Sequence, residues 1–568
     1  MLKVINYCLV GILLSASLIF FGYDLSDNES RSLSLDKIVY ETGGYCDADL
    51  SLEGNVDINN QKVVLMVMLE YDRDPINMVE GLDPMSMNSY MYHSYYKKDY
   101  QEYHTRMNNE LVETLNIGDY QSMYISTLTP FIEYTYVQWQ FDMNKEEILK
   151  NLNANSNVKK VYVQYLTNSV GYVDTLLDGT GMAGAANDVI YRNYTGDGVV
   201  VGLLENGIID TSHQNFVGVD VTIHDQSGFT ETASEHTTKV ASIIGGIDGV
   251  ACDVAFLTSQ INGGICEEVD WLIENGADII NMSFSNLNKD GVYGSTSAYV
   301  DYTARVYSQI FVASSGNTNG TSNYYVDDPG LAFNAITVGA IDTDFYWRDF
   351  SCYMTATGSA VKPTVMAKGF SIGIPNISGV DSGTSLSCAF VSGLCALILE
   401  RYPSLTNNPM KLISLITTNA TRTLDDYYYD EDNGFDEKMG SGEFSYINIC
   451  DNIIYYESIP YSTSETNTVV HRHEFVLDEG ETVQASIAWF SYADEDDTTT
   501  AARTNYDIRL MYNGVVYSAG STTYNNIEMV NFTAPADNSE CAIIILQHSA
   551  QVLTTETICY SYRIFTES

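Results

Sequence analysis

The stretch "GVVVGLLENGIIDTSHQNF", residues 198–216, gives the first indication of both the fold and a functional site. It begins with a short run of valine, leucine and glycine and breaks at Glu205-Asn206-Gly207. A short apolar run that ends at a turn signal is typical of a buried strand, such as those of a parallel sheet. A buried strand that ends on a carboxylate and a glycine indicates the floor of a functional site, so Glu205 is the first candidate residue.

The same pattern recurs through residues 170–449, which we expect to form one domain. Short apolar segments alternate there with stretches whose apolar residues have helical spacing. The strand-like segments are 198–204, 253–261, 278–284, 309–315 and 335–341, and the helical ones include 266–276 and 296–308. Apolar strands joined by helices predict an α/β fold, in which a parallel sheet is covered by helices on both faces.

Residues 40–169 predict a small α+β domain with an antiparallel sheet. The segment "KVVLMVMLEYD" (62–72) has the composition of a strand, and residues 130–166 follow the order strand, helix, strand. We expect Asn144 to cap this helix, because asparagine is a favoured N-cap and apolar residues at helical spacing follow it. Those residues are Ile148, Leu149 and Leu152.

Residues 450–568 predict an all-β sandwich, because alternating or apolar runs are separated there by turn residues. The whole chain has ten cysteines and no C-x-x-C pair, which argues against a zinc ribbon or a redox motif. Cys541 and Cys559 both lie on strand-like segments of this domain. A disulfide between them is expected if the two segments form a hairpin outside the cell.

The composition and the N-terminus indicate an exported acidic protein. The chain has 74 acidic and 27 basic residues, a formal net charge of −47, which excludes nucleic acid as a partner because phosphate binding requires clustered lysine and arginine. Residues 1–24 place one lysine before a long apolar run, the pattern of a signal peptide or an N-terminal anchor. No clean small-x-small cleavage site follows Phe21. We therefore expect a secreted or cell-surface protein, in the second case tethered to the membrane by its N-terminus.

Two predicted helices of the α/β domain begin at reactive side chains. His236 lies in "SEHTTKVASIIGG" (234–246), whose apolar residues share one helical face. Ser385 lies near the start of the segment 382–403, whose apolar residues follow the spacing of a buried helix. A serine at such a helix start directs its hydroxyl and its own N–H into one space, which suits a nucleophile that also binds an oxyanion.

A serine nucleophile requires a base, and the base requires an orienting carboxylate. The α/β domain contains three histidines, His213, His224 and His236, and only His236 leads into a helix of small residues. A fourth segment, "FVASSGNTNG" (311–320), predicts a buried strand followed by Asn317. The side-chain amide of Asn317 is able to donate a second hydrogen bond to an oxyanion.

These segments, in this order, resemble the subtilase family of serine peptidases. The resemblance is strongest at "GTSLSCAFVSG" (383–393), and "DIINMSFS", "VASSGN", "ITVGA" and "KPTVMAKG" also match. It implies that Ser385 is the nucleophile, His236 the general base and Asn317 the oxyanion donor. Glu205 stands at the position of the orienting carboxylate, and the implied substrates are polypeptides.

The resemblance extends to the flanking domains and to cofactors. Residues 40–169 are similar to the family's pro-domain, which inhibits and chaperones the peptidase, and the cleaved linker is expected near residues 165–175. The C-terminal domain is similar to sandwiches appended to such peptidases. The implied chemistry requires no cofactor, and the family implies structural calcium, for which the sequence assigns no ligands.

Glu205 is the main departure from the family pattern, because the family carries aspartate there. Glutamate is longer by one C–C bond, roughly 1.5 Å, and a misplacement of about 1 Å can cost on the order of 100-fold in rate. Its task is only to accept the imidazole N–H and stabilise the imidazolium, which glutamate performs in other triads. Asp210 is the competing candidate, but its place in a turn favours a cap or a cation ligand.

Two smaller departures concern the helices. The usual H-G-T-H is His236-Thr237-Thr238-Lys239, and the usual proline four residues after the serine is Ala389. Lys239 is predicted either to point to solvent or to lower the pKa of His236. Alanine at position 389 keeps helix propensity.

We therefore expect an exported serine endopeptidase, made as a zymogen, that hydrolyses peptide bonds through a Ser-His-Glu triad and an acyl-enzyme. The alternative is a catalytically inactive binding or adhesion protein that keeps the subtilase fold. Ser385, His236 and Asn317 favour the enzyme, and the altered Glu205 and the altered His236 motif favour the alternative.

Overall fold

The computed structural model describes most of the chain from residue 38 onward. The described residues are 38–42, 45–47, 62–70, 89–166, 194–226, 229–286, 291–318, 320–356, 361–374, 376–421, 435–451, 455–461, 468–492, 504–522, 525–549 and 556–566. The predicted signal or anchor at 1–24 and nearly all of the predicted cleavage linker at 165–175 lie outside these ranges.

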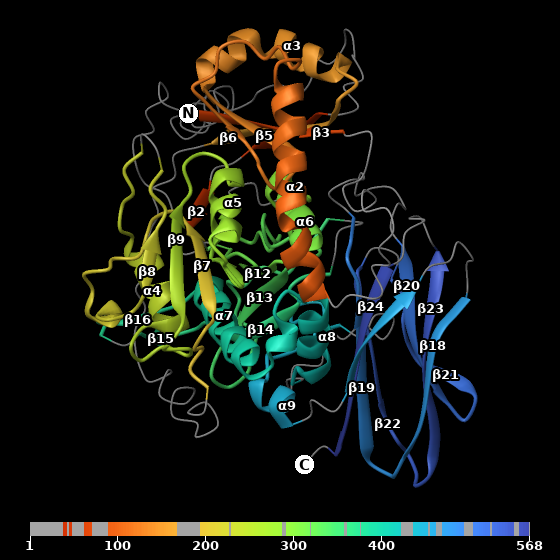
Figure 1. The fold of residues 1–568 in the computed structure, drawn as a ribbon. Helices are drawn as coiled ribbons and strands as arrows, with labels where there is room; N and C mark the ends of the chain where they lie inside the picture. Colours follow the sequence, from red (N-terminus) through yellow and green to blue (C-terminus); the bar gives the residue numbers. More distant parts are fainter. Residues whose placement is uncertain are drawn as a thin grey trace, which may run out of the picture.

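A seven-stranded sheet with the order β14-β13-β12-β10-β7-β9-β8 forms the centre of the molecule (Figure 1). All neighbouring strands in it are parallel. The strands are β7 (Val200–Glu205), β8 (Val221–Ile223), β9 (Ala255–Gln260), β10 (Ile279–Met282), β12 (Ile310–Ser314), β13 (Ile336–Ile341) and β14 (Val365–Lys368). The parallel sheet predicted from the apolar segments is therefore confirmed.

Helices cover both faces of this sheet. Successive residues of a strand point to opposite faces, so neighbouring residues of β7 pack against different sets of helices. On β7, Leu203 packs in the core formed with α4, α7, α8 and α9, whereas Leu204 packs in the core formed with α5 and α6. The bounds of the first set are α4 (Glu235–Gly245), α7 (Thr384–Arg401), α8 (Pro409–Asn419) and α9 (Tyr446–Asp451). Those of the second set are α5 (Cys266–Glu274) and α6 (Ser295–Tyr307).

The N-terminal unit is a five-stranded sheet with the order β1-β6-β3-β5-β4, built on a βαββαβ arrangement. Its elements are β1 (Ile38–Thr42), β3 (Lys62–Leu69), α2 (Ser89–Val112), β4 (Ser122–Ile125), β5 (Phe131–Val137), α3 (Gln138–Ala154) and β6 (Val158–Leu166). The pairs among β3, β4, β5 and β6 are antiparallel, as predicted. The edge strand β1 pairs with β6 in parallel, so the prediction of a wholly antiparallel sheet is wrong at this edge.

The two faces of the N-terminal sheet bury different neighbours. Val63, Leu65 and Val67 of β3 pack in the unit's own core with α3, whereas Met66 and Met68 pack in the core that contains α5 and α6. The N-terminal sheet therefore shares a hydrophobic core with the two helices that cover one face of the central sheet (Figure 1).

Asn144 does not cap α3, so that prediction is wrong. The helix begins at Gln138, directly after β5, and Val137 is the N-cap residue. Asn144 lies inside the helix and donates from Nδ2 to the carbonyl of Gln140, 3.0 Å away. The capping propensity of asparagine is overridden because strand and helix are continuous here.

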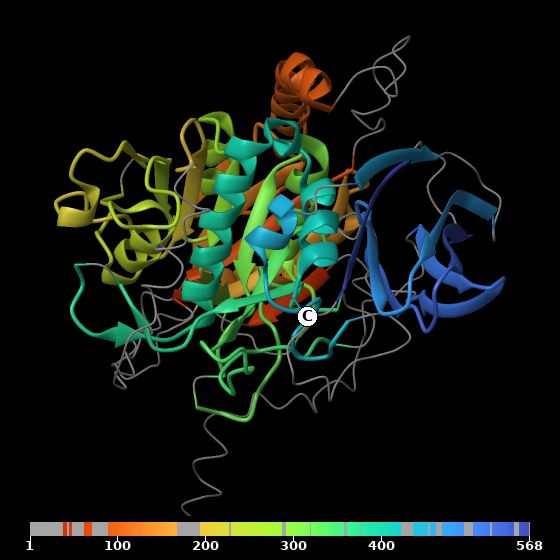
Figure 2. The ribbon, with the colours of Figure 1, turned by 90° about the horizontal axis from the view of Figure 1, so that it is seen from below.

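The C-terminal region forms two four-stranded antiparallel sheets, in agreement with the predicted sandwich. The first has the order β17-β24-β19-β22 and the second β18-β23-β20-β21. Seen from below, they lie to one side of the central unit (Figure 2). Bounds are β17 (Tyr455–Tyr461), β18 (Thr468–Leu477), β19 (Glu481–Ala488), β20 (Asn505–Tyr512), β21 (Val515–Gly520), β22 (Ile527–Thr533), β23 (Ser539–Ser549) and β24 (Glu556–Thr566).

Cys541 and Cys559 do not form the expected disulfide. Cys541 lies on β23 and Cys559 on β24, which belong to different sheets, and both thiols are free. The expectation of a hairpin is wrong because β23 pairs with β18 and β20 instead.

One described helix, α7, has the length and composition of a membrane span but is mostly buried. Among the described residues, α7 is the one helix long and apolar enough to span a membrane, and 83% of it is buried, as in the core helix of a folded domain.

The remaining described elements are short. They are β2 (Tyr45–Asp47), η5 (Gln214–Phe216), β11 (Phe284–Asn286), β15 (Ile372–Gly373), β16 (Val380–Asp381) and η6 (Pro403–Leu405).

Candidate active site

Glu205 is the last residue of β7, and its side chain is completely buried. Its Oε1 atom accepts hydrogen bonds from the backbone N–H of Ser283, at 2.8 Å, and from Nδ2 of Asn281, at 3.1 Å. Both donors lie at the end of the adjacent strand β10 or directly after it. The longer side chain of glutamate therefore spans to the neighbouring strand, where two N–H donors hold one carboxylate oxygen.

Asn281 is itself oriented by α7. Its Oδ1 accepts from the hydroxyl of Ser392 at 2.9 Å and from the thiol of Cys388 at 3.2 Å. These bonds make Oδ1 the acceptor and leave Nδ2 as the end of the amide that donates to Glu205. The carboxylate is thus held through a buried network that reaches the nucleophile helix.

His236 is the second residue of α4, as predicted, and only 8% of it is exposed. Its Nδ1 lies 3.8 Å from Oε2 of Glu205, the carboxylate oxygen not held by Ser283. This separation is longer than a hydrogen bond and short enough for an ion pair when the imidazole is protonated. Hydrogen bonds of catalytic groups are often long before a substrate binds.

The loop after Glu205 is tied closely to the start of α4. A Cβ at Gly207 would lie 2.5 Å from the Cβ of Ser234, so only glycine permits this approach. Thr237 donates from Oγ1 to the carbonyl of Gly207 at 3.1 Å, and the N–H of Asp210 donates to Oγ1 of Thr238 at 3.0 Å. Thr237, which replaces the glycine of the usual H-G-T-H, and Thr238, which matches its threonine, therefore connect the carboxylate loop to the histidine helix.

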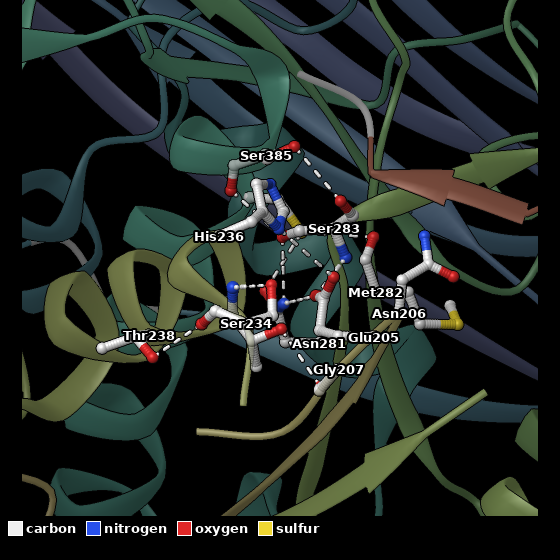
Figure 3. Close-up of polar contacts among 12 residues, drawn as sticks. Glu205, Asn206, Gly207, Ser234, His236, Thr238, Asn281, Met282, Ser283 and Ser385 are labelled. Carbon is white, nitrogen blue, oxygen red and sulfur yellow. Dashed lines mark hydrogen bonds and ion pairs between the residues drawn. The ribbon is translucent and has the colours of Figure 1, made fainter. Parts of the chain in front are cut away.

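Ser385 is the second residue of α7, as predicted, and has no exposed surface. By this position its N–H has no acceptor within the helix. The helix start packs tightly, because a Cβ at Gly369 would lie 2.1 Å from Oγ of Ser387. The Ser385 hydroxyl donates to the carbonyl of Ser283 at 3.1 Å. Figure 3 shows the imidazole of His236 between the side chains of Ser385 and Glu205.

Asn317 follows β12 and is nearly buried. Its Oδ1 accepts from the N–H of Thr384 at 3.1 Å and from the hydroxyl of Thr384 at 3.2 Å. This places the Asn317 side chain against the residue before Ser385 and makes Nδ2 its donating end. The structure therefore brings all four predicted site residues, Glu205, His236, Asn317 and Ser385, to the start of α7 and the strand ends around it.

Comparisons with known proteins identify the family of the chain. The model of the subtilase family (Peptidase_S8) matches residues 196–442. Subtilisin DY of Bacillus licheniformis is 30% identical over 266 residues, which cover 43% of this chain and 91% of that protein. The chain belongs to the subtilase family. Subtilisin E of Bacillus subtilis (strain 168) is 31% identical over 259 residues, 42% of this chain and 64% of that protein.

Among solved structures, the prenylagaramide maturation protease PagA is 24% identical and covers 48% of this chain and 98% of its own. Its TM-score of 0.38 is too low to add to the assignment.

The unusual lysine of this subtilase has its charge balanced by two carboxylates. Nζ of Lys239 lies 2.8 Å from Asp381 and 2.9 Å from Glu235. Burial lowers the pKa of Lys239, and the contacts with Asp381 and Glu235 outweigh burial and raise the pKa above its ordinary value. Lys239 therefore does not point freely to solvent, which was one of its two predicted roles.

The other candidates in this subtilase have structural contacts of their own. Asp210 accepts from the N–H and the hydroxyl of Ser212, at 2.9 and 2.6 Å, as a turn cap. His213 accepts from the N–H of Asn215 at 3.3 Å. His224 stacks on Trp271 with ring centroids 4.5 Å apart. These contacts favour Glu205 and His236 as the carboxylate and the base.

Calcium ligands are not identified in this subtilase. Within the described ranges, no group of three or more histidine, cysteine, aspartate or glutamate side chains could hold a metal ion. The part of the chain that the structure describes therefore gives no site to which a cation can be assigned.

Two residues that the sequence did not single out, Asn281 and Ser283, hold the carboxylate. Both lie in "DIINMSFS", which predicts a strand and matches a family motif without marking either residue. A signal was present, because Asn281 is a lone amide inside an otherwise apolar strand, and buried amides require partners.

Proposed function

We propose that this subtilase is an exported serine endopeptidase, made as a zymogen, that hydrolyses polypeptides through a Ser385-His236-Glu205 triad. One observation carries the proposal: Glu205 is fixed through one oxygen by Ser283 and Asn281 and presents the other to Nδ1 of His236 at 3.8 Å. A carboxylate fixed in this way is suited to accept the Nδ1 proton and to orient the imidazole.

The reaction begins when the Ser385 hydroxyl turns from the Ser283 carbonyl to Nε2 of His236. Nε2 takes the hydroxyl proton while Oγ attacks the scissile carbonyl carbon, and the carbonyl oxygen becomes an oxyanion. The N–H of Ser385 and Nδ2 of Asn317 donate to that oxygen. The imidazolium carries its positive charge beside Glu205 until it returns the proton to the departing amine.

Water completes the cycle. His236 takes a proton from a water molecule, which attacks the acyl-enzyme, and the second tetrahedral intermediate collapses to release the acid. The proton then returns to Oγ of Ser385. Throughout, Glu205 stays ionised and holds the imidazole in one tautomer.

Glutamate in place of aspartate is compatible with this role. The additional methylene brings the carboxylate to the donors on β10 and the residue that follows it. Because these donors come from a central strand and a buried amide, the longer side chain is held in one place. Fixing the carboxylate in this way counters the loss of rate that a misplaced carboxylate would cause.

Contacts between the N-terminal unit and the central unit support a zymogen. Tyr124 and Ser126 donate to Asp270 at the middle of α5, at 2.9 and 2.6 Å, and Thr127 donates to Glu274 at 2.7 Å. Together with the shared core, these contacts suit a pro-domain that stabilises the peptidase. Export is proposed from the apolar run in residues 1–24.

The test is hydrolysis by the purified full chain. We expect wild type to degrade casein and to release its N-terminal unit, with both reactions lost in Ser385→Ala and the fold retained by circular dichroism. A folded wild-type chain that does neither would favour the inactive binding protein.

A further inference from the structure

The strand β11 starts at Phe284, directly after Ser283, whose carbonyl contacts the candidate nucleophile Ser385. The carbonyl of Ser283 accepts from the hydroxyl of Ser385, and β11 begins at Phe284. β11 is not part of the seven-stranded sheet, and within the described residues its strand partner is β2. An exposed strand edge binds an extended peptide through main-chain hydrogen bonds. The edge of β11 is therefore a place where a polypeptide would be held beside Ser385.

That edge is occupied by the chain's own N-terminal segment. β2 pairs with β11 in the antiparallel sense, with Asp47 opposite Phe284, Cys46 opposite Ser285 and Tyr45 opposite Asn286. Because the pairing is antiparallel, β2 runs toward the nucleophile, and Asp47 is its residue nearest to Ser283. Ser385 has no exposed surface in this state.

The position of β2 depends on the N-terminal unit. β1 is the edge strand of that unit and pairs with β6 from Ile38–Thr42 onto residues 161–165. Only Gly43 and Gly44 separate β1 from β2 in the sequence. A tether this short holds a segment at an effective concentration of roughly millimolar. Figure 1 shows β2 on the side of the central unit that faces the N-terminal sheet.

We propose that Tyr45–Asp47 is a built-in inhibitor strand that occupies the polypeptide-binding edge of β11 until the N-terminal unit leaves. The proposal rests on the function proposed above and adds the segment that blocks it. This segment precedes the core of the N-terminal unit, whereas the expected cleavage linker follows β6. Cutting that linker would leave β2 in place, so activation requires the whole unit to dissociate or the β2 segment to be removed.

The first measurement follows the strand itself, in the full chain carrying Ser385→Ala so that self-cleavage cannot remove β2. Cys46→Pro removes an N–H and fixes the backbone, which disfavours strand pairing. Cys46→Ser is the matched control because it keeps the N–H. We expect hydrogen exchange of the amides in 284–286 to be about fivefold faster with proline and unchanged with serine, since one lost hydrogen bond is worth about 1 kcal/mol and tenfold corresponds to about 1.4 kcal/mol.

The second measurement tests whether the strand blocks binding. A fluorescent peptide of residues 38–50 is added at micromolar concentration to the same three chains. We expect binding only to the Cys46→Pro chain, because a tethered strand at millimolar effective concentration outcompetes the free peptide in the other two. If Cys46→Pro fails to fold, Tyr45→Pro serves as the second variant.

Equal exchange in the proline and serine chains, or equal peptide binding to them, would overturn the proposal. Neither readout requires catalysis, because both use chains without the nucleophile. If both measurements give the expected results but the wild-type chain never hydrolyses casein, the proposed peptidase function is refuted. The proposal that β2 occupies a peptide-binding edge would then still stand.

Discussion

Two buried carboxylates, Glu205 at the candidate active site and Asp270 beneath the N-terminal unit, show opposite designs. Both have no exposed surface. Glu205 accepts from a backbone N–H and a side-chain amide. Asp270 accepts from three hydroxyls, of Ser126, Tyr124 and Tyr299.

The kind of donor decides what each carboxylate can do. N–H groups can only donate, so the pair that holds Glu205 always presents donors to its Oε1 atom. Hydroxyls can turn and accept, so the cluster around Asp270 tolerates a protonated carboxyl. Burial raises the pKa of Asp270 to about 7, although the hydrogen bonds from Ser126, Tyr299 and Tyr124 oppose the shift. The donors to Glu205 are fixed N–H groups, whereas the hydroxyls around Asp270 can turn when that carboxyl gains or loses its proton.

Matched amide substitutions give the largest contrast. Glu205→Gln is expected to lower turnover by about 10⁴-fold, because a neutral amide does not stabilise the imidazolium and favours the wrong tautomer. Asp270→Asn is expected to change turnover per active site by less than about threefold, since it touches no reacting group. Casein-peptide kinetics on both folded variants measure the contrast, and equal losses would remove it.

Removal of one donor at each carboxylate gives a smaller contrast. Asn281 is a positioning residue, and Asn281→Ala leaves a buried charged acceptor short of one hydrogen bond, at about 1.5–3 kcal/mol. We expect kcat to fall by about 10- to 100-fold with KM little changed. Tyr124→Phe, which removes one donor from Asp270, is the control and should leave kcat unchanged. A rise in KM alone after Asn281→Ala would mean that Asn281 serves binding instead.

The pH dependence of the N-terminal contact gives the smallest effect. The pKa of Asp270 is about 7 in the folded chain against an ordinary value of 3.8. Its stabilising contribution is therefore full below about pH 4 and is lost as pH rises through about 7, at up to about 1.4 kcal/mol per pH unit. Burial also raises the pKa of Glu133 and Glu268 nearby, which acts in the same direction.

Hydrogen exchange of residues 124–129 in the Ser385→Ala chain, corrected for intrinsic rates, measures this opening free energy between pH 4 and 8. Asp270→Asn should reduce the slope of this opening free energy against pH by up to about 1.4 kcal/mol per pH unit, the contribution of one proton. An opening free energy that rises with pH would contradict the assignment.

The fold of the central unit could be predicted from the sequence because the signals for its strands and helices are local. The apolar strand segments and the helix that starts near Ser385 follow from periodicity, and the four candidate site residues are predicted from the side chains that stand at strand and helix ends. Asn144 was misassigned because capping propensity says nothing about a strand that runs directly into a helix.

Pairings between strands that lie far apart in the chain could not be predicted from the sequence. Cys541 and Cys559 are each on a strand, but which strands pair is decided across the sandwich. The pairing of β2 with β11 joins segments more than 200 residues apart, and nothing in "YCD" signals it. The donors to Glu205 are similarly set by the register of β10 on β7.

The most direct test of the Ser-His-Glu centre is reaction of the full chain with a fluorophosphonate probe, followed by mass analysis of the peptide that contains Ser385. We predict covalent labelling of Ser385 in wild type, with none in His236→Ala and strongly slowed labelling in Glu205→Gln. Labelling of wild type and Glu205→Gln at the same rate would contradict the role of Glu205. No labelling of a folded wild-type chain, with or without its N-terminal unit, would contradict the peptidase itself.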